Sequence, residues 1–117
     1  DKSFDYAMLI HVLHHTDNYH PVLKEAARVA RKGIILMDHI SESRIDFITL
    51  MIRDWPANVP FGVYTPYNYV SQHAWNELFA LLHLCPKLYS NRIFLYGKGL
   101  DFLLGRRMDF ICRLEHT

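Results

Sequence analysis

Residues 3–17 read SFDYAMLIHVLHHTD, and this stretch decides the fold. An apolar run from Tyr6 to Ile10 stops at a turn that is rich in histidine. A second apolar run, GIILMDH at residues 33–39, follows further along the chain. Continuous apolar runs without alternation are typical of parallel strands buried on both faces. Two such strands joined by a helix form a right-handed βαβ unit, so both strands end at the same edge of the sheet.

The segment between the two runs has the pattern of an amphipathic helix, expected from about Asn18 to Arg31. Its apolar residues recur at helical spacing, and charged residues lie mostly opposite them. Asp17 or Asn18 is expected to cap the start of this helix, and Gly33 to end it in the left-handed conformation. In open α/β sheets, ligands bind where such strands end, so the histidines there are candidates for a site.

The middle of the chain predicts a cover over that edge. A helix is expected over residues 41–55, apolar on nearly all sides and ended by Pro56. An ordered loop over residues 56–69 should follow, because its three prolines argue against a central strand. Ser71 is expected to cap another helix.

Composition limits the classes of function. The chain has 117 residues, of which 50% are hydrophobic, so it forms one domain at most and can bury a core. A formal net charge of +1 gives no support for nucleic-acid binding. The two cysteines are far apart, which suggests a reducing compartment and a cytoplasmic location. The apolar stretches are too short to predict an integral membrane segment.

Four motifs, in this order and spacing, resemble the class I S-adenosylmethionine-dependent methyltransferases. They are DKSFD at residues 1–5, HVLHH at 11–15, LKEAARV at 23–29 and KGIILMDH at 32–39. The resemblance implies an α/β fold, the second half of a doubly wound Rossmann-like sheet. It implies two parallel strands plus a C-terminal antiparallel hairpin, with helices on the faces. The runs at about 88–94 and 108–114 fit that hairpin.

The family's Gly-rich turn after its first strand, and the acidic residue that holds the ribose of the cofactor, are missing from this sequence. We therefore expect residues 1–117 to be a single domain, the C-terminal part of a methyltransferase domain. Residues 41–84 would be the helical and loop cover over its active-site edge. Alone, such a chain is expected to be inactive and to lack saturable binding of S-adenosylmethionine.

The resemblance implies S-adenosylmethionine-dependent methyl transfer to a small-molecule or lipid-like acceptor, on O or N. The turn formed by Ile10, His11 and Val12 would contact the cofactor. The candidate catalytic bases are the histidines that follow the two strands, since the unperturbed pKa of histidine suits proton transfer: His11, His14, His15 and His39. Acceptor-binding candidates are Asp38, Tyr67 and Asn68. Each of these residues also has a structural interpretation, as a helix cap or a packed side chain.

Two other functions stay open. One is a non-catalytic half-domain that self-associates, because the strand from Tyr6 to Ile10 would have an exposed edge. The other is a histidine-metal hydrolase. The histidine spacing matches no closed structural zinc pattern, and neither cysteine is near the histidines in sequence, so the sequence predicts no metal site.

Overall fold

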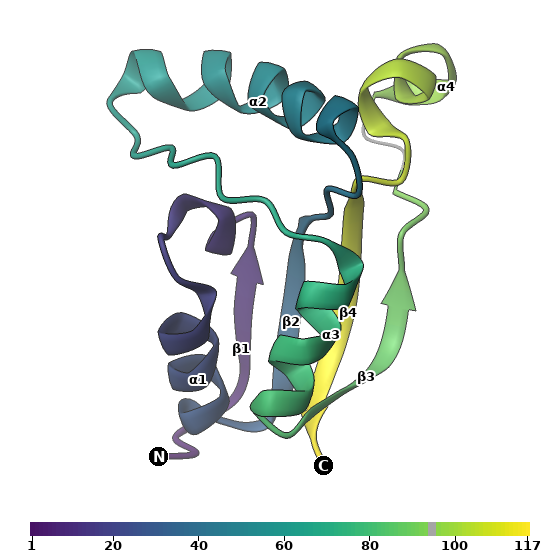
Figure 1. Cartoon of the computed structure of the whole chain (residues 1–117). Coiled ribbons are helices and arrows are strands. Elements are labelled where there is room, and N and C mark those ends of the chain that lie inside the picture. The colour runs from purple at the N-terminus through teal and green to yellow at the C-terminus, as the bar shows by residue number, and fades with distance from the viewer. Residues whose placement is uncertain (94–95) are drawn as a thin grey trace.

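The computed structural model, which describes residues 1–93 and 96–117, contains an open four-stranded sheet in the order β1-β2-β4-β3 (Figure 1). β1 and β2 are parallel, whereas β4 runs antiparallel to both β2 and β3. The elements along the chain are β1 (Phe4–Ile10), η1 (Leu13–His15), α1 (Tyr19–Val29), β2 (Ala30–His39), α2 (Arg44–Asn58), η2 (Val59–Phe61), α3 (Gln72–Leu81), β3 (Leu84–Ser90), α4 (Gly97–Leu100), η3 (Asp101–Gly105) and β4 (Asp109–His116).

These pairings confirm the α/β fold, the early parallel pair and the late antiparallel pair that the sequence predicts. Residue 94, the last of the predicted run at about 88–94, lies outside the described residues. Among the described residues, no helix combines the length and the apolar character needed to cross a membrane.

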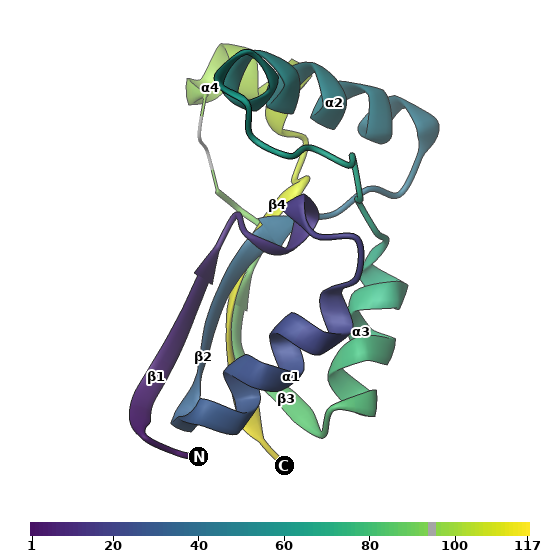
Figure 2. The ribbon, with the colours of Figure 1, turned by 90° about the vertical axis from the view of Figure 1, so that its left-hand side faces the viewer.

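Both α1 and α3 pack against the same face of the sheet (Figure 2). The core between these layers contains fully buried side chains from each of them, including Leu23 of α1, Trp75 of α3, and Ile34 and Phe110 of the sheet. α2 lies across the end of the sheet at which β1 and β2 finish (Figure 1). Of the predicted cover, α2 thus lies at the edge that carries the histidines, whereas α3 packs on the face of the sheet.

β1 differs from the strand buried on both faces that its sequence predicts. It is an edge strand of the described sheet and pairs with β2 alone. Tyr6 and Met8 are exposed, with Met8 at 69%. The reason is that α1 and α3 cover only the other face of the sheet. An unpaired strand edge beside exposed apolar side chains is a surface on which another strand can pair.

Gly33 does not end the first helix. α1 is capped by the Asn18 side chain, which accepts a hydrogen bond from the His20 N–H, and it stops at Val29. Gly33 lies inside β2, where it faces the backbone of β4. A Cβ at this position would clash with the backbone carbonyl oxygen of Leu114. The glycine is thus needed for the close approach of two strands and not for a turn.

Pro56 lies inside the helix that it was expected to end, and Pro86 lies inside a strand. Pro56 falls within the last turn of α2, which starts after its cap Ser43 and continues to Asn58. Pro86 lies within β3, which begins at Leu84 instead of near residue 88. β3 is an edge strand, and its register with β4 shifts just after Pro86, so the missing N–H costs no ladder bond in the sheet interior. The Ser71 cap of α3 is confirmed.

Candidate functional site

The turn after β1 is held in a conformation that non-glycine residues rarely adopt. His11 has a φ of 52°, in the left-handed region. Its N–H donates a hydrogen bond of 2.8 Å to the carbonyl oxygen of Met37 on β2. Such strained residues persist where their surroundings fix them, and they concentrate at functional sites. The strain places the His11 ring 4.9 Å from the ring of His39.

Asp38, at the end of β2, fixes this turn through the hydrogen bonds of its carboxylate. Its side chain is fully buried. One carboxylate oxygen accepts a 3.0 Å hydrogen bond from the Leu13 N–H. The other oxygen lies 2.9 Å from the His39 backbone nitrogen and 2.6 Å from Nδ1 of His14. Because a carboxylate only accepts hydrogen bonds, Nδ1 of His14 carries a proton in this pair.

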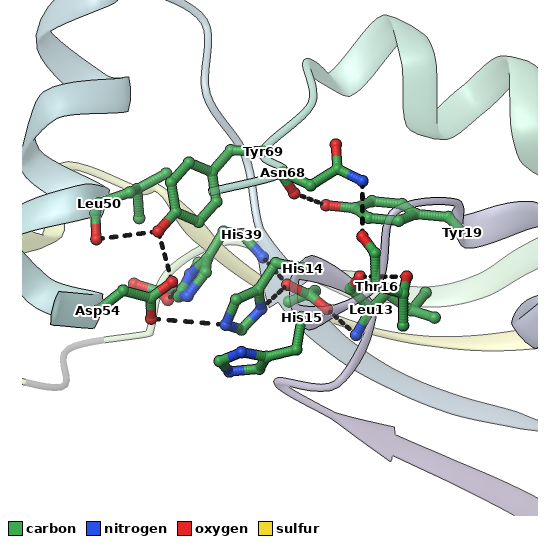
Figure 3. Close-up of polar contacts among 12 residues, drawn as sticks. Leu13, His14, His15, Thr16, Tyr19, His39, Leu50, Asp54, Asn68 and Tyr69 are labelled. Atoms are coloured by element: carbon green, nitrogen blue, oxygen red, sulfur yellow. Dashed lines mark hydrogen bonds and ion pairs between the residues drawn. The ribbon is translucent and has the colours of Figure 1, made fainter. Parts of the chain in front are cut away.

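His14 lies between two carboxylates (Figure 3). Its Nε2 is 3.5 Å from Oδ1 of Asp54 on α2, and the Tyr69 hydroxyl donates to the other oxygen of Asp54. Burial opposes a charge on His14, but its hydrogen bonds to Asp38 and Asp54 outweigh burial and raise its pKa to about 9. Burial also acts against the Asp54 charge, yet His14 and Tyr69 lower its pKa to about 2. His14 and Asp54 are therefore an ion pair at neutral pH.

His39 has its own carboxylate partner. Its Nδ1 is 2.8 Å from Oδ1 of Asp109, the first residue of β4. Nη2 of Arg53, from α2, donates to the same oxygen at 2.9 Å, and Nε of Arg53 donates to the Tyr96 hydroxyl. Burial raises the pKa of Asp109, but the bonds from His39 and Arg53 outweigh it, so that the pKa is lowered overall. Asp109 fixes the ring of His39 and leaves its Nε2 without a carboxylate partner.

His11 is the neutral member of the cluster. Burial, followed by the neighbouring His39, lowers its pKa, and Asp38 and Asp109 offset this only in part. Within the described residues, neither of its ring nitrogens has a hydrogen-bond partner. His15 instead has Nδ1 2.8 Å from the carbonyl oxygen of Tyr64, and its ring is 4.2 Å from the ring of His14. At neutral pH, His11 thus offers a free nitrogen lone pair.

All four predicted catalytic histidines line one open cavity of about 320 Å³. The other lining residues come mostly from α2, and they are Arg53, Asp54, Ala57, Asn58 and Tyr96. The topology thus brings together residues that are 28 positions apart, His11 and His39, as the strand-edge argument expects. Their catalytic roles stay predictions.

The other predicted site residues are placed around this cavity and not within it. Ile10 and Val12, the predicted cofactor contacts, are partly exposed at the same turn, at 38% and 40%. The side-chain amide of Asn68 donates a hydrogen bond of 2.9 Å to the carbonyl oxygen of Thr16 (Figure 3). The backbone carbonyl oxygen of Asn68 accepts a hydrogen bond from the Tyr19 hydroxyl. This bonding fastens the loop over the turn after β1. Its role in acceptor binding, like that of Asp38, stays a prediction.

Tyr67 lies on a different side of α2. It lines a separate apolar hollow of about 420 Å³, together with Met51, Ile52, Trp55 and Pro56. It also packs against the small buried cluster of Leu50, Tyr69 and Met108. The structure therefore does not bring Tyr67 together with the histidines, and its contact with an acceptor stays a prediction.

Sequence reasoning missed the charged partners of the histidines. Arg53 and Asp54 are adjacent in the second half of a helix that is rich in apolar residues, and Asp109 begins a strand. A charged pair inside a helix that is apolar on nearly all sides was the one signal available, because such a pair is seldom buried without partners. Tyr69, whose hydroxyl bonds to Asp54, carried no comparable signal.

Two groups of side chains in the described residues offer metal-ligand atoms within 4.8 Å of one another. One group is His11, His14, Asp38 and His39, and the other is His14, His15 and Asp54. Imidazole nitrogen and carboxylate oxygen are ligands that Zn²⁺ accepts. The cavity thus has the donor set both for proton transfer and for a bound cation.

Comparison with known proteins agrees with the architecture. Residues 1–37 match the sequence profile of a family described as "Methyltransferase domain". No curated protein matches the sequence. One similar solved structure is a chain from a Haloferax volcanii complex between the Trm112 methyltransferase activator and a protein assigned as a methyltransferase, with a TM-score of 0.65 and 10% identity. Another is the YcgJ protein from Bacillus subtilis, with a TM-score of 0.54 and 17% identity.

The first similarity covers 100% of this chain and the second 98%, whereas the chain spans only 56% and 62% of the two solved chains. At these identities the likeness concerns the fold. The profile match ends at Met37, so it covers β1, the histidine turn, α1 and most of β2. Residues 1–37 thus resemble the methyltransferase domain family, and the whole chain shares the fold of these two solved structures.

Proposed function

We propose that this chain forms the acceptor side of an S-adenosylmethionine-dependent methyltransferase that modifies an O or N atom of a small-molecule or lipid-like acceptor. The observation that carries this proposal is the convergence of four histidines around one cavity at the carboxyl edge of β1 and β2. Ligands of open α/β folds bind at this edge. S-adenosylmethionine supplies the methyl group from a sulfonium centre.

The turn after β1 fits one side of such a cofactor. Ile10 and Val12 present partly exposed apolar side chains there, and His11 between them has a lowered pKa and no ring hydrogen bond in the described residues. A neutral imidazole beside an apolar surface suits a cationic sulfonium, because it adds no repelling charge. We propose Ile10, His11 and Val12 as the contacts of this chain with the cofactor.

The acceptor must lose a proton when its nucleophile is a hydroxyl or an ammonium group. His11 is the best-placed base, because its pKa is lowered and its ring is free to accept a proton. His39 is the second candidate, since Asp109 binds its Nδ1 and stabilises the charge it would gain. His14 already holds a proton between Asp38 and Asp54, so we assign it a positioning role. His15 borders the cavity from the side of the loop.

The cover supports an acceptor with an apolar part. The hollow on the other side of α2 is lined by Met51, Trp55 and Tyr67, which suits a chain or ring that is moderately apolar. We propose that Tyr67 contacts the acceptor there, and that Asp38 and Asn68 shape its entrance through the turn and the loop that they hold.

The test compares two histidine variants of the full-length protein. His11→Ala should weaken S-adenosylmethionine binding in calorimetry, or slow the transfer of labelled methyl groups to a metabolite and lipid extract, by about 10²-fold or more, as expected for loss of a general base. His83→Ala is the control, because His83 follows α3 and lies outside the cavity. Equal and small effects of both variants would remove His11 from the site.

A second function is favoured by the exposed edge of β1. The side chains of Phe4, Tyr6 and Met8 are exposed along a strand that has only one described neighbour. Such an edge can pair with a second copy of the chain, which would make it an oligomerisation module. Sedimentation of this chain at increasing concentration tests the idea, and a monomer at all concentrations would argue against it.

We also propose a cytoplasmic location. Cys85 and Cys112 are both free thiols in the structure. Burial raises the pKa of the Cys112 thiol to about 12, so it is unreactive. Free cysteines of this kind suit a reducing compartment.

A further inference from the structure

We infer that the histidine cavity binds a divalent transition-metal ion of the Zn²⁺ type, with nitrogen atoms of His11, His14 and His39 as its ligands. This inference goes beyond the proposed function, because metal binding requires neither the methyl donor nor the acceptor. It rests on the spacing of the ligand atoms, on the partners of the ring nitrogens and on the balance of buried charge.

The three imidazoles are already close together. One ligand atom from each of them, and one from Asp38, lie within 4.8 Å of one another. The ring of His39 is 4.9 Å from that of His11 and 4.5 Å from that of His14. Zn²⁺ binds imidazole nitrogen at about 2.0–2.1 Å, so tetrahedral ligands stand roughly 3.4 Å apart. The ligand atoms must therefore move closer together before they can bind one ion. The ring of His11, which has no hydrogen bond among the described residues, can rotate to shorten its distances to the other ligands.

The partners of two rings match those of metal-ligating histidines. A ligating histidine usually donates its second ring N–H to a carboxylate or a backbone carbonyl, which fixes the tautomer and strengthens the ligand. His14 has this relation to Asp38 through Nδ1, at 2.6 Å, and His39 has it to Asp109, at 2.8 Å. In His39, Nε2 has no carboxylate partner among the described residues and remains for an ion. In His14, Nε2 lies 3.5 Å from Oδ1 of Asp54, so an ion there would displace the proton of this pair.

The buried charges also favour a cation. Three carboxylates, those of Asp38, Asp54 and Asp109, are buried around the cluster. Arg53 is the permanently cationic side chain bonded to them, and it contacts Asp109. With His14 protonated, His14 and Arg53 compensate two of the three carboxylates, and one negative charge is left in a buried site, which is costly. A divalent ion that displaces the His14 proton would balance all three carboxylates together with Arg53.

The sequence predicted no metal site because the spacing of its histidines fits no closed structural zinc pattern. Catalytic zinc sites differ from these patterns, since they use three protein ligands and keep one position open. Here the ligands come from the ends of two strands, and their carboxylate partners come from β2 and β4. An ion with an open position would lower the pKa of a bound hydroxyl, and so would take the place of the histidine base in the deprotonation of the acceptor.

The experiment titrates Co²⁺, and Zn²⁺ in competition, into the full-length protein after chelator dialysis, without any methyl donor. Wild-type protein should bind one ion per chain and show the visible absorption of tetrahedral Co²⁺ with nitrogen ligands. His11→Ala and His39→Ala should weaken binding more than 100-fold. Asp109→Asn should weaken it about 10- to 100-fold, the range expected for a partner of a ligand. His73→Ala, an exposed histidine on α3, is the matched control and should leave binding unchanged.

Absence of the Co²⁺ absorption in wild-type protein would overturn the inference, and so would equal affinity of His11→Ala and His73→Ala. If circular dichroism shows that His39→Ala is unfolded, the Co²⁺ affinity of His11→Ala decides the test, because His11 is partly exposed and its loss should not unfold the protein. The two proposals fail separately: an ion bound by a protein that transfers no methyl group refutes only the methyl transfer. Methyl transfer by a protein that binds no ion refutes only the metal site.

Discussion

The two regions that enclose the histidine cavity contribute different chemistry. The β1-η1-α1-β2 unit, residues 4–39, supplies all four histidines and Asp38. The cover, α2 with the loop that follows it, supplies Arg53 and Asp54, and β4 adds Asp109. The first region decides where the imidazoles lie, and both regions supply the carboxylates, Asp38 and Asp54, that hold the proton of His14. Position and protonation of the same side chains are thus set by segments far apart in sequence.

The regions also differ in how they are fastened. Within the βαβ unit, the histidine turn is fixed by a fully buried carboxylate that accepts hydrogen bonds from Leu13, His14 and His39. The loop of the cover is joined to the turn by more exposed bonds, such as those of Asn68 to Thr16 and of His15 to Tyr64. Buried bonds without access to water cost more to break than exposed ones. The turn should therefore be the rigid part of the site and the loop of the cover the yielding part.

The largest effect is expected for Asp38→Ala. Loss of this carboxylate leaves two buried backbone N–H groups and the His14 ring without a partner, so the free energy of unfolding should fall by about 3–5 kcal/mol. Glu77→Ala is the control, because Glu77 forms only an exposed pair with His73 and should cost about 0–1 kcal/mol. Urea unfolding measures both, and equal losses would show that the turn is no better fixed than the surface.

The dependence of stability on pH tests whether the cover sets the charge of His14. Its folded pKa, about 9, lies above the unfolded value of 6.5, so its stabilisation is complete below pH 6.5 and is lost as the pH rises to 9. Over this interval the free energy of unfolding should fall by up to about 1.4 kcal/mol per pH unit. Asp54, with its pKa lowered to about 2 from 3.8, loses its contribution only as the pH falls through that lower range.

Asp54→Asn should flatten the decline between pH 6.5 and 9, because it removes one of the two carboxylates that hold the His14 proton. His14→Gln should flatten it further. Chemical unfolding at a series of pH values gives the slopes. A wild-type stability that stays level across this interval would show that the ion pair between the two regions does not form.

The smallest effect is expected for Asn68→Ala, which weakens only the join between the loop and the turn. Loss of the 2.9 Å hydrogen bond to Thr16 should lower the free energy of unfolding by about 0.5–1.5 kcal/mol. Asn76→Ala, which loses an exposed bond to Gln72 on α3, is the matched control and should have almost no effect. A loss as large as that of Asp38→Ala would contradict the description of the loop of the cover as the yielding part.

The sequence by itself determined the parallel pair of β1 and β2 and the crossing helix α1, because apolar runs and helical spacing are local signals. The convergence of His11, His14, His15 and His39 also followed from it, since the handedness of a βαβ unit places both strand ends at one edge. The Ser71 cap was predicted correctly for the same local reason, whereas the loop expected from residue 56 begins later, because α2 continues to Asn58 and η2 spans Val59–Phe61.

Only the tertiary structure decided the rest. Gly33 is needed because β4, some 80 residues later in the chain, passes against it, and Pro86 is tolerated because β3 lies at the sheet edge. The protonation of His14 depends on Asp54, and the orientation of His39 depends on Asp109, 70 residues away. No local pattern encodes these contacts. Charge in a buried site is set by whichever groups the fold brings within a few ångströms, and that is a property of the assembled molecule.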